Sequence, residues 1–169
     1  MALMLNKDAT MIARMEQDLI QKVQDAYDTH LPDIDFIIHG VFSLDELEML
    51  AEGDLNRGLT VGVGYLGAEI NSPQATSTDR SASTRMINYS FIILLALPIQ
   101  DSTASRCNVT ELLTILRNAI FGSALCAGDR TQRTWNFVRE KPEIAESSKT
   151  LLYYSQVWQA AMPTVGNQS

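Results

Sequence analysis

Two long strand-like segments separated by a polar insert constrain the fold of this chain more than any other feature. Residues 59–70 form the first segment and residues 85–97 form the second. The second segment alternates apolar and polar residues up to Ser90, and from Phe91 to Leu97 it is apolar at every position. Alternation is typical of a half-exposed strand, whereas a continuous apolar run is typical of a strand covered on both faces. The pattern predicts a strand that leaves a packed core and continues into a more exposed arm.

The insert between these segments, residues 71–84, is polar, and seven of its fourteen residues are Ser or Thr. Loops of about 12–15 residues without regular structure are usually either functional or disordered. We therefore expect a long β-hairpin that protrudes from the sheet and carries a polar loop. Such a part is better suited to contact with neighbouring subunits than to forming an enzyme pocket.

The rest of the chain predicts helices packed on this sheet. Apolar residues at helical spacing predict one helix over residues 8–30 and another that starts at Asn108, and Ser43 with Glu46 forms the capping-box pattern of a short helix between them. Further strands are expected at residues 34–41, 134–139 and 150–161, with polar connections at 98–107 and 141–149 and a short tail at 163–169. This order predicts a single α+β domain over residues 1–169, with a mainly antiparallel sheet.

Composition argues against several classes of protein. Thirteen basic and twenty acidic residues give a net charge of −7, whereas tight binding to nucleic acid needs clustered Lys and Arg. Cys107 and Cys126 form no C-x-x-C motif, so neither a disulfide framework nor a zinc site is expected. The chain shows no secretory-signal pattern, and its longest apolar run, residues 91–98, covers less than half a bilayer. We expect a soluble cytoplasmic protein.

Few residues are candidates for chemistry. Gly62, Gly64 and Gly67 match the G-x-G-x-x-G spacing, but they lie inside a predicted strand with no helix after it, which favours close packing or strand bending over dinucleotide binding. His30 and His39 have no further ligands at metal-binding spacing. The sequence therefore predicts no cofactor and no metal.

The sequence contains few candidates for a catalytic acid, base or nucleophile. The acidic residues near the short helix alternate with leucines, which favours a solvated face over a catalytic carboxylate pair: they are Asp45, Glu46, Glu48, Glu52 and Asp54. The serines of residues 71–84 have no histidine in the same segment. A catalytic Ser–His–Asp triad assembled by the fold from residues distant in sequence stays an open alternative. The sequence predicts no catalytic residue.

Four motifs follow one another along the chain. They are a helix that ends at Leu31-Pro32, a Val61-x-Val63-x-Tyr65 strand, an NVTELLTILRNAIFG helix at 108–122 and an aromatic LLYYSQVW strand at 151–158. In this order they resemble the tail terminator proteins of long-tailed bacteriophages, particularly those of Mu-like phages. The resemblance spans residues 8–161, and the helix is its most specific part.

This resemblance implies a small structural protein that forms a six-membered ring on the end of the tail tube, stops its polymerisation and offers a surface for joining the head. The implied partners are copies of this chain, the tail tube protein and the head-side connector or stopper protein. Genome DNA would pass through the channel without specific binding, and no membrane takes part. The implied location is the tail or neck of the virion, and the host cytoplasm during assembly.

The resemblance carries over no catalytic residue, but the two strand segments would supply contacts to other subunits or to the tube. The residues expected there are Tyr65, Ile70, Asp79, Arg80, Arg85, Ile87 and Tyr89. For Asp79, Arg80 and Arg85, ion pairs between subunits and simple solubility of an exposed hairpin are equally compatible with the pattern.

Other functions stay open. The chain could be another neck or head-completion connector protein, a small cytoplasmic enzyme with a site built from scattered polar residues, or a binding module without a viral role. A deep pocket with convergent titratable groups would favour the enzyme.

Overall fold

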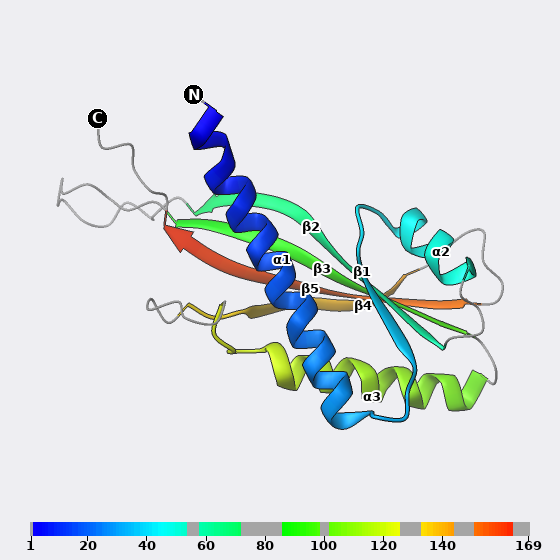
Figure 1. The fold of residues 1–169 in the computed structure, drawn as a ribbon. Coiled ribbons are helices and arrows are strands. Elements are labelled where there is room, and N and C mark those ends of the chain that lie inside the picture. Colours follow the sequence, from blue (N-terminus) through cyan, green and yellow to red (C-terminus); the bar gives the residue numbers. More distant parts are fainter. Residues whose placement is uncertain are drawn as a thin grey trace.

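The computed structural model describes residues 2–53, 58–71, 86–98, 102–125, 133–143 and 151–163. Their elements are α1 (Ala2–His30), β1 (Phe36–Gly40), α2 (Leu44–Gly53), β2 (Leu59–Asn71), β3 (Met86–Pro98), α3 (Ser102–Ile120), β4 (Asn136–Glu143) and β5 (Leu151–Pro163). The strands form one sheet in the order β1-β2-β3-β5-β4 (Figure 1). β1 and β2 pair in parallel, and the other neighbouring strands pair antiparallel. The predicted α+β class with a mainly antiparallel sheet is confirmed.

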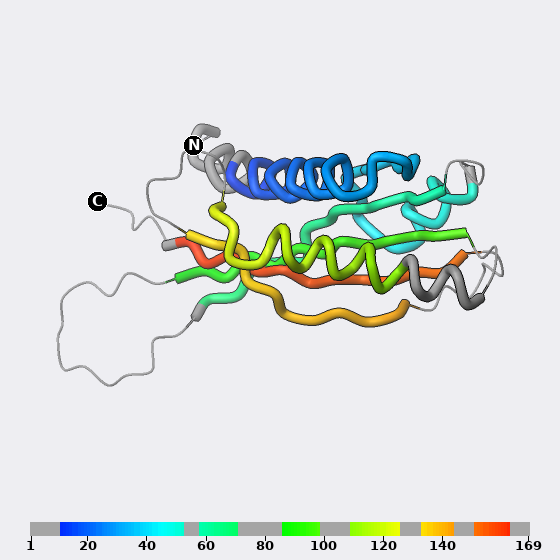
Figure 2. Tube along the Cα trace, turned by 90° about the horizontal axis from the view of Figure 1, so that it is seen from below, coloured from blue at the N-terminus to red at the C-terminus, as the bar shows by residue number. Residues whose placement is uncertain are grey.

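Helices α1 and α3 lie side by side on one face of the sheet (Figures 1 and 2). Successive strand residues point to opposite faces, so alternate residues of β2 and β3 meet these helices. The main core consists of buried apolar residues from all these elements, including Met15, Leu19, Val23, Val61, Val63, Phe91, Ile93, Leu95, Leu112 and Leu116. The predicted helical stripe of α1 is therefore the stripe that packs on the sheet.

Helix α2 lies on the opposite face of the sheet, near one end (Figure 1). The glycines of β2 allow this close packing. A Cβ atom on Gly62 would lie 2.6 Å from Cγ2 of Val41, and one on Gly64 would lie 2.5 Å from the carbonyl oxygen of Val41. The predicted close approach is confirmed, although the backbone that approaches belongs to the β1–α2 connection and not to a helix.

The capping box of α2 forms as its pattern predicts. The Ser43 hydroxyl accepts a 3.2 Å hydrogen bond from the backbone N–H of Glu46. The Glu46 carboxylate in turn accepts a 2.7 Å hydrogen bond from the N–H of Phe42, one residue before the cap. Two backbone donors that the helix itself cannot satisfy are thereby paired.

Two predicted connections are partly wrong. α3 begins at Ser102 and not at Asn108, because polar residues without Gly or Pro can extend an existing helix at little cost. β4 continues through Pro142 to Glu143, and proline is tolerated there because β4 is an edge strand with one unpaired side.

The two segments of the predicted hairpin pair antiparallel from Thr60 opposite Ala96 to Asn71 opposite Met86. Residues 72–84 of the predicted polar loop (71–84) lie outside the described residues, as does the tail from residue 164 onward. The protruding hairpin therefore stays a prediction.

Candidate assembly surface

The second half of β2 is exposed, in contrast to the first. Residues 59–64 are buried, whereas residues 65–70 are exposed or half-buried. On the paired part of β3, residues 86–88 are half-buried, and the strand becomes mostly buried from Tyr89 onward. This confirms the predicted change from a packed strand to a more exposed one.

A β-bulge at Leu66 separates the two halves of β2. Tyr65 pairs with Phe91 and Gly67 pairs with Ser90, so Leu66 has no partner across the ladder. Gly67 has a φ of 134°, which residues with a side chain rarely adopt. A bulge of this kind inserts one extra residue and bends the strand.

The bulge determines which side chains of β2 share a face. Beyond it Ile70 pairs with Ile87, on the face that also carries Tyr65. Uninterrupted alternation from Tyr65 would instead place Ile70 on the opposite face. The sequence analysis did not identify this bulge, although a glycine inside a strand is the signal that can indicate one.

Tyr65 is anchored by aromatic neighbours on its own face. Its ring centroid lies 5.3 Å from that of Phe91 and 6.5 Å from that of Tyr89. Tyr89 is only 6% exposed, so it supports Tyr65 and offers little surface itself. Desolvation raises the pKa of Tyr65 above its ordinary value of 10.0. A tyrosine phenol is neutral at physiological pH at that ordinary value already, and it can donate a hydrogen bond.

Ile70 provides the most exposed apolar side chain of this face, at 59%. The structure thus brings four predicted contact residues to one face of the β2–β3 ladder: Tyr65, Ile70, Ile87 and Tyr89. The other three, Asp79, Arg80 and Arg85, lie outside the described residues. We call Tyr65, Ile70 and Ile87 the arm surface.

A second apolar surface lies at the α2 end of the molecule, and the sequence analysis did not predict it. Phe42 is 99% exposed and Met49 is 75% exposed. At a helix start of this kind, the residue before the cap often packs on the fourth helical residue, here Leu47. Leu47 instead packs beside Gly62, where a Cβ would lie 3.1 Å from it, and is fully buried. Phe42 is consequently left in solvent.

Beside Phe42 the surface forms a hollow of about 180 Å³ between the β1–α2 connection and the sheet. Its lining is mostly apolar and includes Val41, Phe42, Leu44, Leu66, Ile92 and Leu94. Tyr65 of the arm surface and the carboxylate residue Glu143 also line it, so the two surfaces adjoin at Tyr65. Pockets for small-molecule ligands usually measure about 300–1,000 Å³. This hollow is therefore better suited to a protruding side chain than to a substrate.

Two candidate sites from the sequence, for a nucleotide and for a metal, find no matching geometry among the described residues. The three glycines of the G-x-G-x-x-G pattern all lie within β2, which is not the strand–turn–helix context of nucleotide binding. No group of three or more His, Cys, Asp or Glu side chains in the described ranges is arranged to hold a metal ion. Within those same ranges, no helix combines the length and apolar character needed to span a membrane.

Two of the four described acidic residues of α2 are solvent-facing, as predicted, and two are not. Asp45 and Glu52 are exposed and Glu46 belongs to the helix cap, but Glu48 is 9% exposed and therefore buried. Asp54 lies outside the described residues.

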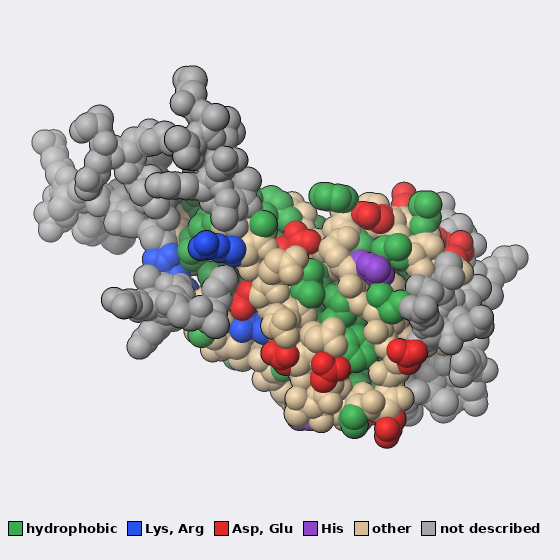
Figure 3. Space-filling model, viewed as in Figure 1, with side chains coloured by type: hydrophobic (Ala, Val, Ile, Leu, Met, Phe, Trp, Pro, Cys, Tyr) green, Lys and Arg blue, Asp and Glu red, His purple; other side chains and the backbone are tan. Residues whose placement is uncertain are grey.

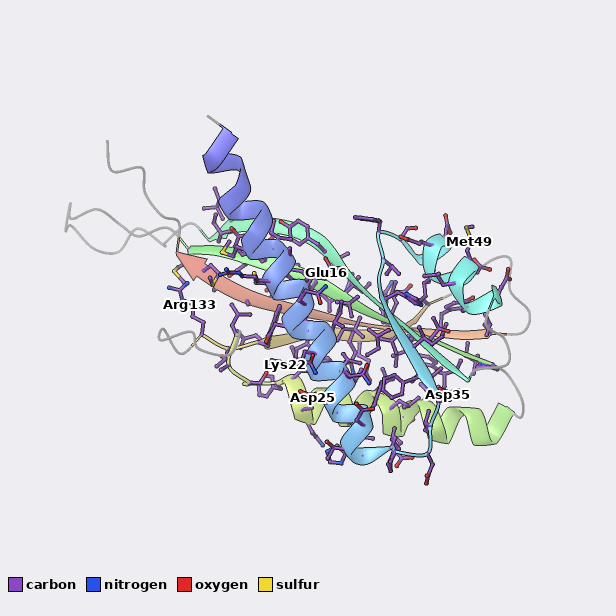
Figure 4. The ribbon with its side chains drawn as sticks, viewed as in Figure 1. Glu16, Lys22, Asp25, Asp35, Met49 and Arg133 are labelled. Atoms are coloured by element: carbon purple, nitrogen blue, oxygen red, sulfur yellow. The ribbon has the colours of Figure 1, made fainter. Side chains whose placement is uncertain are left out.

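One carboxylate outside α2 has a shifted pKa. Glu16 lies on α1 (Figure 4), and its carboxylate is in close contact with Gly40 at the end of β1. Burial in this position raises the pKa of Glu16 above its ordinary value. No metal cluster of described residues accompanies it, and we assign it no chemical role.

No protein-family model matches the sequence, and no curated protein matches it. Among solved structures, the chain is similar to one from the virion of a native gene transfer agent particle, with a TM-score of 0.49 and 12% sequence identity. That alignment covers 88% of this chain and 94% of the other. A second solved chain is similar with a TM-score of 0.39 and 15% identity, over 86% of this chain and 96% of that one.

Proposed function

We propose that this protein is a structural, non-enzymatic component of a phage-like virion, and that it acts as a tail terminator. In this role it forms a six-membered ring on the last layer of the tail tube, stops further polymerisation and presents a new surface to the head-side connector. The observation that carries the proposal is the arm surface, where exposed Ile70 lies opposite Ile87 on the face that holds Tyr65.

The physical reason lies in how a tube grows. Each layer of such a polymer presents the same surface to the next layer, so growth continues until a different molecule covers that surface. An extended ladder with apolar side chains on one face can bind such a layer by packing or by strand addition. The opposite end of the same molecule then offers another surface to the head.

The negative net charge supports a place beside a DNA channel. Each copy has a net charge of −7, and like charges repel a phosphate backbone. DNA could therefore pass through a ring of these chains without being held. The motif order that resembles tail terminators agrees with this role.

A tube-length assay tests the proposal. Purified tail tube protein is allowed to polymerise with and without this protein, and tube lengths are measured by negative-stain electron microscopy. We expect shorter tubes that carry a ring at one end. Tubes of unchanged length without a ring would contradict the proposal.

The same microscopy separates the tail terminator from a head-completion protein. In particles that lack this protein, a tail terminator leaves tails of uncontrolled length, whereas a head-completion factor leaves tails of normal length beside unjoined heads. Finding the second phenotype would replace our proposal with the connector function.

A further inference from the structure

The outer edge of β2 is paired over only part of its length. β1 pairs with β2 from Leu59 to Val63, and the chain then leaves the sheet toward α2. Among the described residues, no strand pairs with β2 on this side beyond Val63. An open strand edge presents a row of N–H and C=O groups to which another strand can add. We call the outer side of residues 65–71 the free edge.

The ladder indicates which residues of the free edge direct their backbone groups outward. The N–H of Val41 donates a 2.9 Å hydrogen bond to the carbonyl of Val63, so this carbonyl points away from β3. Residues with outward and inward backbone groups alternate in an antiparallel pair. Every second residue of β3, counted from the partner of Val63, therefore faces an outward residue of β2. The outward residues of the free edge are Tyr65, Ala68 and Ile70, which pair with Phe91, Tyr89 and Ile87.

The side chains along the free edge are mostly apolar and exposed. Tyr65 is 38% exposed, Leu66 50% and Ile70 59%. Figure 3 shows apolar side chains along the upper margin of the molecule, over β2 and the connection from β1 to α2. Natural sheet edges are often protected by Lys or Pro, but residues 65–71 contain neither. The bulge bends this strand and leaves the edge beyond it open, as expected for an edge that pairs in an assembly.

The hollow beside Phe42 lies at one end of the free edge. The connection from β1 leaves the edge at Val41 and crosses the sheet at Gly64, so an added strand must end beside this connection. Tyr65 and Leu66 line the hollow there. The carboxylate of Glu143, also in the lining, accepts a 2.7 Å hydrogen bond from Ser155 and lies 3.1 Å from the ammonium of Lys141. Because this carboxylate already has partners, the hollow can accept an apolar side chain.

The described strands of this chain that have an open side are poorly suited to the free edge. β4 contains Pro142, a bulge after Phe137 and charged residues at 139–141 and 143, and these features oppose strand addition. β1 has five residues, and β5 is open only at residues 160–163. Pairing of two free edges through a two-fold axis would close at two copies and could not form a ring. These features favour an extended segment of a different protein as the occupant.

We propose that an extended segment of the tail tube protein, in the last layer of the tube, adds to the free edge as a further strand of the sheet. Its backbone hydrogen-bonds with the outward groups of Tyr65, Ala68 and Ile70, and its alternate side chains pack beside those of Tyr65 and Ile70. An apolar side chain of the segment enters the hollow beside Phe42. The inference rests on the proposed function and specifies how the tube is bound.

Hydrogen exchange at single residues tests the added strand. Tubes of purified tail tube protein are capped with this protein, and exchange is quenched and measured by fragmentation mass spectrometry. In the free protein, the amides of Tyr65, Ala68 and Ile70 should exchange faster than those of Gly67 and Glu69, which face β3. On tubes, the outward amides should exchange at least about tenfold more slowly, because they become hydrogen-bonded. Unchanged exchange of the outward amides on tubes overturns the inference.

Proline substitutions test the same edge independently. The N–H of Ala68 points away from β3, so Ala68→Pro loses no bond of the ladder and should fold. It should bind tubes at least about thirtyfold more weakly in co-sedimentation, as expected for loss of an interface hot spot. Ala68→Val keeps the N–H and should bind like the wild type. Glu69→Pro removes an inward N–H and should unfold at lower urea than Ala68→Pro, and the reverse order would overturn the assignment of the outward groups.

The tube-length assay separates this inference from the proposed function. If Ala68→Pro shortens tubes as well as the wild type does, the strand contact is refuted and the tail-terminator function stands. If the wild-type protein neither binds nor shortens tubes, the proposed function fails and the tube segment with it. Slower exchange of the outward amides in the protein alone, increasing with its concentration, would show that the edge pairs with a second copy and would refute the tube segment.

Discussion

The indole N–H of Trp135 donates a 2.8 Å hydrogen bond to the carboxylate of Asp18, which joins α1 to the segment that leads into β4 across 117 residues of sequence. Trp135 is fully buried, and the ammonium of Lys22 lies 3.4 Å from the same carboxylate. This side-chain pair fixes α1 over the sheet.

Asp18→Ala should lower the free energy of unfolding by about 1–3 kcal/mol, because it leaves a buried N–H without an acceptor. Urea denaturation measures the change. The Trp135→Phe substitution should lower the free energy of unfolding less in the Asp18→Ala variant than in the wild type, because the hydrogen bond of the Trp135 indole is already lost in that variant. Asp25→Ala, on an exposed part of the same helix, should stay within about 0.5 kcal/mol of the wild type. Equal costs for the two aspartates would contradict this role.

Gly64→Ala should destabilise the protein by about 1–3 kcal/mol, because its new Cβ would overlap the backbone carbonyl of Val41. Gly40→Ala is the matched control. Its Cβ would clash only with the carboxylate of Glu16, and the carbonyl oxygen of Val63 would lie at an ordinary contact distance of 4.0 Å. Because a flexible side chain can move away, the change in stability should stay within about 1 kcal/mol in either direction. Thermal or urea unfolding of both variants measures the two changes in stability. A larger loss in Gly64→Ala than in Gly40→Ala would show that the backbone at Val41 cannot move away as the Glu16 side chain can.

Glu16 should make stability depend on pH. Burial raises its pKa in the folded state above its ordinary value of 4.5, so the folded protein holds this proton to higher pH than the unfolded chain does. The contribution of Glu16 to stability therefore falls as pH rises from 4.5 through the raised pKa, and then remains at the lower level. The Glu16→Gln variant has no carboxylate to ionise at this position, so its stability should not fall in this way. Over that pH range its free energy of unfolding should therefore rise relative to that of the wild type. A stability difference that does not vary with pH would exclude the effect.

Ile70→Asp should separate assembly from folding. Ile70 is exposed, so the free energy of unfolding should change by no more than about 0.5 kcal/mol, while activity in the tube-length assay should fall by at least about thirtyfold. Glu69→Gln, at the neighbouring exposed position, should leave both properties unchanged. Normal tube shortening by Ile70→Asp would remove Ile70 from the proposed tube contact.

Ser43→Ala should lower stability by about 1 kcal/mol, because the first turn of α2 loses its hydrogen bond to the cap. Glu46→Gln keeps a side-chain acceptor for the N–H of Phe42 and should cost less. Hydrogen exchange of the α2 amides provides the local measurement. Unchanged exchange in Ser43→Ala would show that packing of Leu47 alone maintains the helix.

Local patterns were enough to predict most elements of this fold. The stripe of Met15, Leu19 and Val23 predicted the packed face of α1, and the structure buries all three. Ser43 and Glu46 predicted the start of α2, and their hydrogen bonds form. These signals succeed because the interactions that produce them span at most a few turns of one helix.

Features that depend on distant residues could not be predicted in the same way. The exposure of Phe42 follows from the packing of Leu47 against Gly62 on a separate strand. The face on which Ile70 lies follows from its register with β3, which alternation within β2 alone predicts incorrectly. The surfaces that carry the functional proposals are therefore the parts for which tertiary structure was needed.

The bulge also determines where β2 can tolerate a change in length. Leu66 has no partner across the ladder, so a chain that lost this residue could keep Ile70 opposite Ile87 with the same pairing. Between Leu59 and Val63 every residue of β2 has a partner, so the loss of one residue there would shift the register. The shift would turn buried valines toward α2 and glycines toward α1. Single-residue deletions in related chains should therefore accumulate at the bulge and be rare before it.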